Sequence, residues 1–277
     1  EGMAGYQLRP WRAGDTAGER LASAEWSLVA AADDGTLAGW ASLRSWTEDD
    51  GVRVFLTLGH VRPADRRRGL GGMLLDATEE AAARLAAQRE PAGPVMLGGN
   101  ADDGEDDRVA LLTGRGYARA FTMVWMRREA SSVPLRDLPE GIAVRAATVD
   151  DAGALWRLAQ RAWAGRPFVS LPPAERLREW LGRSDRSSFL VATSGERLAG
   201  FVAVQGDEVE DVGVDPDFQR RGLASALLTR ALADHGGAVR LRTEAHDPAG
   251  ARTLYERLGF RVVSSHHRYR KPLRQER

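Results

Sequence analysis

Apolar residues are spaced in two different ways along this chain. Short β-branched and aromatic runs end at Gly, Asp or Pro turns, as strands do, whereas longer Ala- and Leu-rich segments have the three-to-four-residue spacing of a helix face. The first half is predicted to form strands at residues 6–12, 27–32, 36–45, 52–61, 95–99 and 121–127, and helices at residues 70–89 and, after the acidic stretch 102–107, up to about residue 116.

The second half repeats this order of elements. Strands are predicted at residues 142–147, 189–193, 198–205, 208–214, 239–246 and 261–269, and helices at residues 150–181 (interrupted by prolines), 223–234 and 248–258. Residues 130–141, with two Ser and two Pro, have the composition of a linker. The pattern predicts an α/β fold of two tandem domains, residues 1–129 and 142–277, each a mixed twisted sheet flanked by helices.

One short segment occurs twice. Arg-Arg-Arg-Gly-Leu-Gly at residues 66–71 returns 153 residues later as Gln-Arg-Arg-Gly-Leu-Ala at residues 219–224. Each copy follows a strand ending in Val-x-Pro and opens an amphipathic helix, whose unpaired N–H groups and dipole attract an anion. Gly69 and Gly222 let the backbone approach that anion. Two such turns, here called the cradles, indicate an internal duplication.

Composition narrows the possible functions. The 277 residues include 39 basic and 39 acidic side chains, which argues against a nucleic-acid backbone as the main partner. The absence of cysteine excludes a disulfide framework, a thiolate nucleophile and a Cys-based zinc site, and the histidines show no metal-ligand spacing. No apolar run reaches the roughly 20 residues of a membrane span. We therefore expect a cytoplasmic protein with no membrane partner and no metal, and the oligomeric state stays open.

Two motifs in the second half point to a family. Residues 214–224 read Val-Asp-Pro-Asp-Phe-Gln-Arg-Arg-Gly-Leu-Ala, and residues 247–260 end in Tyr-Glu-Arg-Leu-Gly-Phe. The first resembles the pyrophosphate-binding turn of the GNAT superfamily of acyl-CoA-dependent N-acyltransferases, Q/R-x-x-G-x-G/A, and the second resembles its downstream helix. The tandem arrangement is also similar to mycothiol synthase and related two-domain members. The resemblance implies acetyl-CoA as cofactor and a small-molecule or peptide amine as substrate.

The resemblance also implies which residues hold the cofactor. In the second half, the backbone of Val212, Gly213 and Val214 would pair with the pantetheine arm. The pyrophosphate would lie on the turn formed by Gln219, Arg220, Arg221, Gly222, Leu223, Ala224 and Ser225. By duplication, the corresponding set in the first half is His60, Val61, Arg66, Arg67, Arg68, Gly69, Leu70 and Gly71.

Acyl transfer to an amine requires a proton acceptor and a proton donor. An alkyl ammonium has a pKa of about 10.4, so a carboxylate is the natural base at neutral pH. Alternation along residues 208–214 predicts that Glu208, Glu210, Val212 and Val214 share one face, and the family's base often lies at the position of Glu208. Glu208 and Glu210 are therefore the expected bases, with Glu244 a third candidate.

The resemblance implies that Tyr255, four residues before Gly259, is the acid that protonates the leaving thiolate. The first half lacks this pair, since alignment of the cradles places Phe55 and Thr57 opposite the two glutamates and Leu112 opposite Tyr255. Its first two strands are also separated by only residues 13–26, against 148–188 in the second half.

The sequence thus predicts an N-acetyltransferase whose second domain is catalytic and whose first domain has a structural or regulatory site. Mycothiol synthase-type acetylation of a cysteinyl pseudodisaccharide, antibiotic or peptide acetylation, and a non-catalytic acyl-CoA-binding module remain alternatives.

Overall fold

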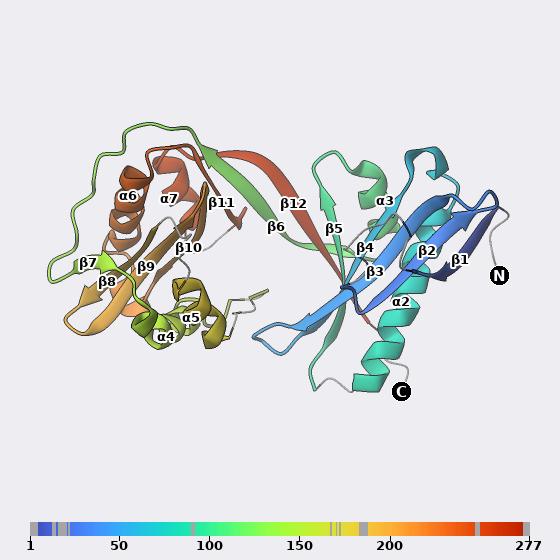
Figure 1. Ribbon diagram of the computed structural model, residues 1–277, viewed down its shortest axis with the longest axis horizontal. Helices are drawn as coiled ribbons and strands as arrows, with labels where there is room; N and C mark the ends of the chain where they lie inside the picture. The colour runs from blue at the N-terminus through green and yellow to red at the C-terminus, as the bar shows by residue number, and fades with distance from the viewer. Residues whose placement is uncertain are drawn as a thin grey trace. The chain divides into compact units, whose positions relative to one another are not determined.

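Two units make up the chain in the computed structural model, which describes residues 5–12, 15, 21, 23–89, 92–166, 168–169, 171, 173–182, 188–246 and 250–273. Unit 1 consists of Glu1–Phe121 and His266–Arg277, and unit 2 of Thr122–Ser265. Both are α/β units with a mixed sheet, as the sequence predicts (Figure 1).

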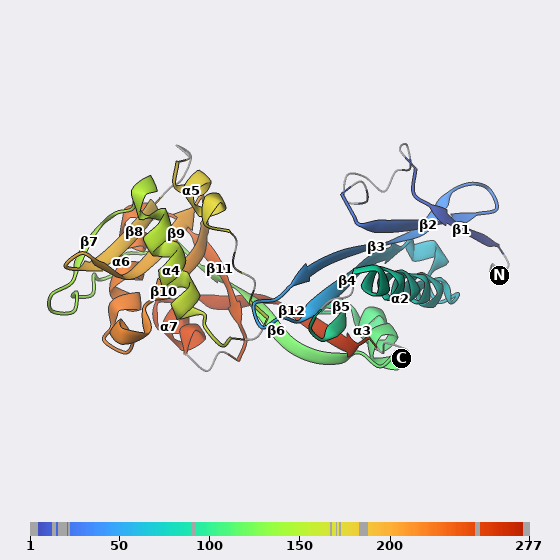
Figure 2. The same cartoon turned by 90° about the horizontal axis from the view of Figure 1, so that it is seen from below.

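Unit 1 contains the sheet order β1-β2-β3-β4-β5-β12. The strands are β1 (Tyr6–Pro10), β2 (Trp26–Ala32), β3 (Leu37–Thr47), β4 (Arg53–Val61), β5 (Val95–Asp102) and β12 (Arg261–Pro272). Helix α2 (Leu70–Arg89) connects β4 to its parallel neighbour β5, and α3 (Asp106–Gly114) follows β5. Both helices lie on the same side of the sheet (Figure 2) and bury Leu75, Phe55 and Leu112 beneath them.

Unit 2 contains the sheet order β6-β11-β10-β9-β8-β7. The strands are β6 (Ala118–Arg128), β7 (Ala143–Ala146), β8 (Ser188–Ser194), β9 (Arg197–Gln205), β10 (Glu208–Val214) and β11 (Val239–Glu244). Helices α4 (Ala152–Ala162) and α5 (Ala174–Gly182) cover one face, and α6 (Leu223–His235) and α7 (Ala251–Arg257) cover the other (Figure 1). The helical region predicted at 150–181 is therefore two helices, and Pro167 and Pro172 between them lie outside the described residues.

The last strand of each half of the sequence belongs to the sheet of the other half. β6 pairs with β11 and buries Val124 and Met126 in the core of unit 2. β12 pairs with β5 and places Tyr269 in the core of unit 1, where Arg270 Nη2 also lies 3.1 Å from the buried Glu48 carboxylate. The predicted boundaries, 1–129 and 142–277, therefore differ from the observed units.

The physical reason for this difference is the duplication itself. Each half ends its sheet on a similar strand, β5 or β11, with an edge that needs a partner. Alternation of apolar and polar residues predicts that β6 and β12 are strands, but it carries no information on which of two similar edges each one pairs with.

The predicted linker is packed against unit 2. Val133 and Leu138 contact its core, the Arg136 N–H donates to Thr229 Oγ1 at 3.2 Å, and Arg230 Nη1 donates to the Arg136 carbonyl at 2.7 Å. Residues 130–141 thus run as an extended segment along α6, where Val133 and Leu138 are partly buried while Leu135 remains exposed.

Within the described ranges, no helix has the length and apolarity needed to cross a membrane. No group of three or more His, Asp or Glu side chains in those ranges is arranged to hold a metal ion.

Candidate active site

Strands β10 and β11 diverge in the middle of unit 2. They pair in parallel only at Glu208 with Arg240 and at Val209 with Leu241, and beyond Val209 strand β10 continues to pair with β9 alone among the described strands. β4 and β5 in unit 1 behave in the same way, since their pairing ends at Leu56 while β4 continues to Val61. Each unit therefore has a V-shaped opening in its sheet, lined by backbone groups that can pair with an extended ligand.

The two cradles have the same backbone conformation. Arg220 and Gly222 have φ values of 61° and 85°, and Arg67 and Gly69 have values of 62° and 86°. A side chain at either glycine would point into open space, since no atom lies within 4 Å of its Cβ position. In unit 2 the hydrogen bond from the Ala226 N–H to the Gly222 carbonyl opens α6, which leaves the N–H groups of residues 223–225 for an anion.

A cavity of about 1060 Å³ joins the V-shaped opening to the cradle in unit 2. Nine of the ten predicted cofactor residues line it, namely Val212, Gly213, Val214, Gln219, Arg220, Gly222, Leu223, Ala224 and Ser225. Arg221 does not line the cavity, and its guanidinium carbon lies 5.5 Å from the centre of the Phe218 ring. The backbone of the turn, rather than this cation, is what the cavity presents to a pyrophosphate.

The predicted alternation of β10 is wrong after Val209. A β-bulge lies between Val209 and Asp211, so that Glu210 is the extra residue and Asp211 pairs with Ala203. Val212 and Val214 therefore lie on the α6 face, where they pack against its core, and not on the face that Glu208 occupies. The sequence gives no local signal for this bulge, since neither glycine nor proline occurs at the position.

The two predicted bases have different surroundings. Glu208 does not line the cavity, and its carboxylate oxygens lie 3.4 Å from Arg240 Nη2 and 3.6 Å from Arg242 Nε. Glu210 lines the cavity, and burial followed by the neighbouring Glu208 charge raises its pKa, with Arg242 and Arg240 partly opposing. Glu244, the third candidate, also lines the cavity, at the end of β11.

Asp211 is a carboxylate that the sequence reasoning missed. It lines the cavity, and burial raises its pKa to about 7, while the Val212 N–H opposes that rise and the Glu210 charge adds to it. A carboxyl group poised near neutrality in a cavity is a candidate for proton transfer. The only sequence signal for this role would be an Asp next to a Glu on a strand. Strict alternation, however, places Asp211 on the face opposite to Glu208 and Glu210.

Tyr255 lies where the resemblance places it. It projects from α7, is 9% exposed, and lines the cavity, and its ring packs edge-on against Phe260 with centroids 6.0 Å apart. The cavity therefore contains both a phenol and carboxylates. Asp247, which opens the segment similar to the family's downstream helix, lies outside the described residues.

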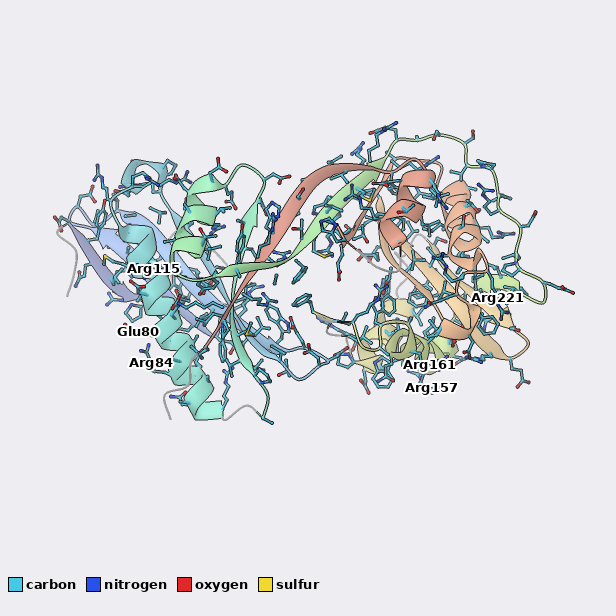
Figure 3. All side chains as sticks on the ribbon, turned by 180° about the vertical axis from the view of Figure 1, so that it is seen from behind. Glu80, Arg84, Arg115, Arg157, Arg161 and Arg221 are labelled. Carbon is cyan, nitrogen blue, oxygen red and sulfur yellow. The ribbon has the colours of Figure 1, made fainter. Side chains whose placement is uncertain are left out.

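A buried aspartate fixes α4 next to the cavity. Asp215 is 1% exposed, accepts from Arg161 Nε at 3.0 Å and from Arg197 Nη2 at 2.9 Å, and Arg161 projects from α4 (Figure 3). Burial alone would raise the pKa of Asp215, but the hydrogen bonds from Arg161, the Asp217 N–H and Arg197 outweigh burial and lower it. This ion pair holds the end of α4, and with it Trp163, at the cavity wall.

The Asp215→Asn substitution is expected to lower the free energy of unfolding by about 1–2 kcal/mol at pH 7, because charged hydrogen bonds are lost but both arginines are half exposed. A lowered pKa stabilises the fold only above the unfolded value, so the difference should shrink as the pH falls below about 4. Urea denaturation at pH 7 and at lower pH measures it. Asp217→Asn, at an exposed partner of Arg197, is the control, and an equal loss in both variants would contradict the assignment.

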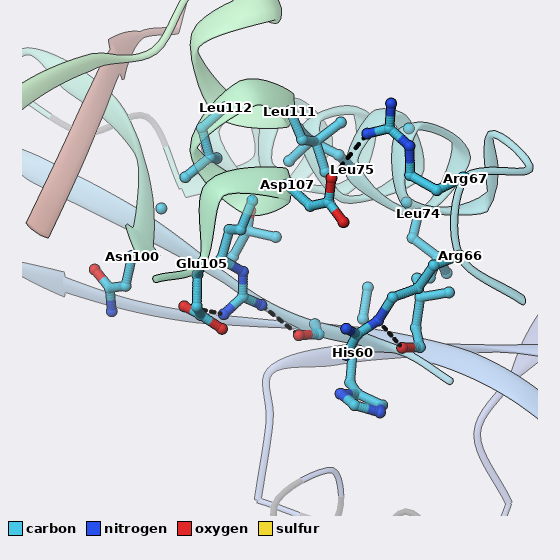
Figure 4. A pocket seen from close by; sticks show the side chains of 18 of the residues that line it. His60, Arg66, Arg67, Leu74, Leu75, Asn100, Glu105, Asp107, Leu111 and Leu112 are labelled. Atoms are coloured by element: carbon cyan, nitrogen blue, oxygen red, sulfur yellow. Dashed lines mark hydrogen bonds and ion pairs between the residues drawn. The ribbon is translucent and has the colours of Figure 1, made fainter. Parts of the chain in front are cut away.

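Unit 1 has a cavity of about 840 Å³ at the matching place. Of the eight residues predicted to hold a cofactor in this half, His60, Val61, Arg66, Arg67, Gly69 and Gly71 line the cavity, whereas Arg68 and Leu70 do not. Leu70 is fully buried, and Arg68 Nη1 lies 3.4 Å from the Tyr6 hydroxyl. In Figure 4, Arg67 points toward Asp107, with which it forms an exposed ion pair of 2.8 Å.

The walls of the unit 1 cavity differ from those of unit 2. Thr57 and the buried Leu112 line it at the positions that alignment sets against Glu210 and Tyr255. Asn100 of β5 lines the same cavity (Figure 4). Unit 1 therefore keeps the opening and the turn but has neither a carboxylate nor a phenol at the two corresponding positions.

Comparisons with known proteins agree with this geometry. Residues 185–262 match the acetyltransferase (GNAT) domain family, and residues 4–90 match the acetyltransferase (GNAT) family. Mycothiol acetyltransferase of Geodermatophilus obscurus is 35% identical over 254 residues, which cover 84% of this chain and 78% of that protein. Mycothiol acetyltransferase of Actinosynnema mirum is 35% identical over 86% of this chain and 81% of that protein.

Two solved structures share the fold. A GCN5-related N-acetyltransferase from Sphaerobacter thermophilus has a TM-score of 0.70 at 24% identity, covering 90% of this chain and 81% of that one. A tandem GNAT protein from the clavulanic acid biosynthesis pathway has a TM-score of 0.62 at 14% identity, covering 100% of this chain and 86% of that one. This chain is an N-acetyltransferase that belongs to the GNAT family, with two GNAT units in tandem and acetyl-CoA, the donor that the family uses, as its cofactor.

Proposed function

We propose that this chain transfers the acetyl group of acetyl-CoA to a primary amine of a small molecule, with the chemistry in unit 2. The observation that carries the proposal is that one cavity in unit 2 joins the V-shaped opening, the cradle, Tyr255 and the carboxylates of Glu210 and Asp211. The part of the cavity beside the cradle suits a phosphate-bearing ligand, and the part beside Trp163 and Asp211 suits an acceptor.

Acetyl-CoA fits the residues present. The open space at Gly222 allows a pyrophosphate to approach the N–H groups at the start of α6, which a side chain there would obstruct. The backbone of residues 212–214 is available to an extended pantetheine arm, because β11 has diverged from β10 at that point. When bound, acetyl-CoA supplies an activated acyl group as a thioester.

Unit 2 supplies the groups that the transfer requires. A carboxylate at the cavity wall takes a proton from the ammonium form of the acceptor, because only the neutral amine has a lone pair for attack. The Tyr255 hydroxyl donates a proton to the departing sulfur, for which a phenol of pKa about 10 is suited. Trp163 at the end of α4 lines the acceptor side of the cavity.

The acceptor class that we propose is a cysteinyl pseudodisaccharide, acetylated on its amine. The support comes from relatives named mycothiol acetyltransferase that are 33% to 35% identical over about four-fifths or more of this chain. Arg166, Arg242 and Arg257 line the cavity together with the carboxylates, which gives the hydroxyl-rich sugar portion of such an acceptor both donors and acceptors.

The experiment that tests the proposal is release of free CoA thiol from acetyl-CoA in the presence of single amines. The panel contains the cysteinyl pseudodisaccharide, glucosamine, an aminoglycoside and a peptide with a free N-terminus. We expect the pseudodisaccharide to give the highest kcat/KM. A higher value for the aminoglycoside or the peptide would reassign the acceptor class, and no release with any amine would favour a non-catalytic acyl-CoA-binding module.

Unit 1 is proposed to be non-catalytic. Its cradle and opening are retained, but Phe55, Thr57 and Leu112 at the three aligned positions cannot exchange protons with a substrate at neutral pH. A CoA-type ligand bound there would stabilise unit 1 by mass action without being consumed.

A further inference from the structure

We infer that Asp211, rather than Glu208 or Glu210, is the carboxylate that takes the proton from the acceptor amine. This inference rests on the proposed function and deepens it, since it assigns the base of the same cavity to a residue that sequence alternation places on the wrong face of the sheet.

The β-bulge at Glu210 sets the position of Asp211. Residues paired across antiparallel strands project from the same face of a sheet. Asp211 pairs with Ala203, which belongs to the core beneath α4 and α5, so its carboxylate lies on the face that these helices cover. Phe201, two residues earlier on β9, packs against Trp163 with ring centroids 6.0 Å apart. Asp211 is therefore next to the aromatic wall on the acceptor side.

The bulge also places Asp211 next to the segment proposed to bind acetyl-CoA. It is the residue immediately before the backbone segment 212–214 that lines the opening between β10 and β11. The Val212 N–H donates to its carboxylate, which holds the carboxylate at the edge of that opening. A base at this point lies between the cradle side and the acceptor side of the cavity. The acceptor amine must lose its proton at this place, because it attacks the thioester there.

The competing carboxylates are less suitable. Glu208 lies outside the cavity, and its two carboxylate oxygens lie 3.4 Å from Arg240 Nη2 and 3.6 Å from Arg242 Nε, so they are directed toward these arginines and not toward the acceptor side. Glu210 is the extra residue of the bulge and is more exposed than Asp211. Asp211, in contrast, has no ion pair with any residue that the structure describes, and burial opposes its charged form, so its affinity for a proton is high for a carboxylate.

The charged groups around Asp211 do not remove its high affinity for a proton. On its own strand the neighbouring charge is Glu210, which raises the pKa of Asp211 further. From β9 the facing residues are the uncharged Ala203 and Phe201. From β11, Arg242 and Glu244 line the same cavity, and from the segment after α4, Arg166 does so. Arg161 of α4 is committed to Asp215.

The Asp211 carboxylate takes one proton from the acceptor ammonium, and the neutral nitrogen attacks the thioester carbonyl. A new N–C bond forms and the C–S bond breaks. The nitrogen loses its second proton and the departing sulfur gains one, through the Tyr255 hydroxyl. The products are the N-acetylated acceptor, free CoA thiol and protonated Asp211, which returns its proton to water.

The test compares four variants with acetyl-CoA and the cysteinyl pseudodisaccharide as probe. We expect Asp211→Asn to lower kcat/KM at pH 7 about 10²-fold or more, and to move the acidic limb of the pH profile from near 7 toward the amine's own pKa. Glu208→Gln is expected to keep the limb near 7. Asp207→Asn, at an exposed carboxylate at the start of β10, is the matched control and should match the wild type.

Two further readouts separate a base from a structural role. Formate should restore part of the activity of Asp211→Ala, because a small carboxylate can enter the space left by the side chain. Asp211→Asn should not melt below the wild type above pH 7, because a carboxyl group whose folded pKa is raised loses stability as the pH rises through that value.

The outcomes are distinct. If wild-type protein is active but Asp211→Asn retains its rate and its acidic limb, the inference is wrong and the proposed function stands. If Glu208→Gln alone moves the limb, the base is Glu208. A loss of activity in Asp211→Ala that formate does not restore, together with a lower melting temperature, would make Asp211 a structural residue. An inactive wild type would overturn the proposed function and this inference with it.

Discussion

Replacement of Gly222 by glutamate is expected to abolish acetyl transfer, with at least a 10³-fold loss of kcat/KM. The Cβ position of Gly222 faces open space in the cradle, so a glutamate side chain would enter the volume that the pyrophosphate occupies. It would also bring a negative charge to the N-terminus of α6. There the carboxylate would compete with the pyrophosphate for the helix dipole and the unpaired N–H groups. CoA thiol release measures the rate, and calorimetry with CoA measures binding.

The matched control is Gly69→Glu. Gly69 has a φ of 86° against 85° for Gly222, and its Cβ position is equally open, so both substitutions strain the backbone to the same extent. We expect Gly69→Glu to retain turnover within about threefold, to remove one CoA site in calorimetry and to lose the thermal stabilisation that CoA gives to unit 1. Loss of activity in Gly69→Glu with activity retained in Gly222→Glu would place the chemistry in unit 1.

The Tyr255→Phe substitution is expected to lower kcat by about 10²-fold or more while leaving the affinity for CoA unchanged, because the departing sulfur loses its proton donor. The ring should keep its place, since it is 9% exposed and packs against Phe260. Stopped-flow measurement of thiol release, with calorimetry for CoA binding, distinguishes the two quantities.

Tyr269→Phe is the control for this substitution, because Tyr269 is also buried, at 4% exposure, but lies in the core of unit 1. Its turnover should equal that of the wild type. If Tyr255→Phe keeps its full rate from pH 6 to pH 9, the role of proton donor does not belong to Tyr255.

Local sequence signals predicted the parts of the site that depend on local structure. The repeated Arg-Arg-Gly-Leu turn gave two cradles, and their φ values agree within about a degree at the corresponding positions. The position of Tyr255 on the short helix α7 followed from its spacing to Gly259, just after that helix, and Tyr255 lines the cavity. In these cases a few consecutive residues determine the conformation, so a single sequence contains the necessary information.

The parts that were missed depend on contacts distant in sequence. β6 and β12 could each pair with either of two similar sheet edges. The observed pairing is stabilised by contacts between residues distant in sequence, such as the ion pair of Arg270 with the buried Glu48. The bulge at Glu210 arises from the pairing of β10 with β9 and reverses the face of every later residue on the strand. That reversal is why alternation favoured Glu210 and overlooked Asp211.

Mass spectrometry of the cysteinyl pseudodisaccharide after incubation with acetyl-CoA and the wild-type protein tests whether unit 2 carries out N-acetylation. We expect one added acetyl group, located on the nitrogen by fragmentation and formed in equal amount to free CoA, with no product from Gly222→Glu protein. Acetylation on sulfur or oxygen, or product formation by Gly222→Glu at the wild-type rate, would contradict an N-acetyltransferase whose chemistry lies in unit 2.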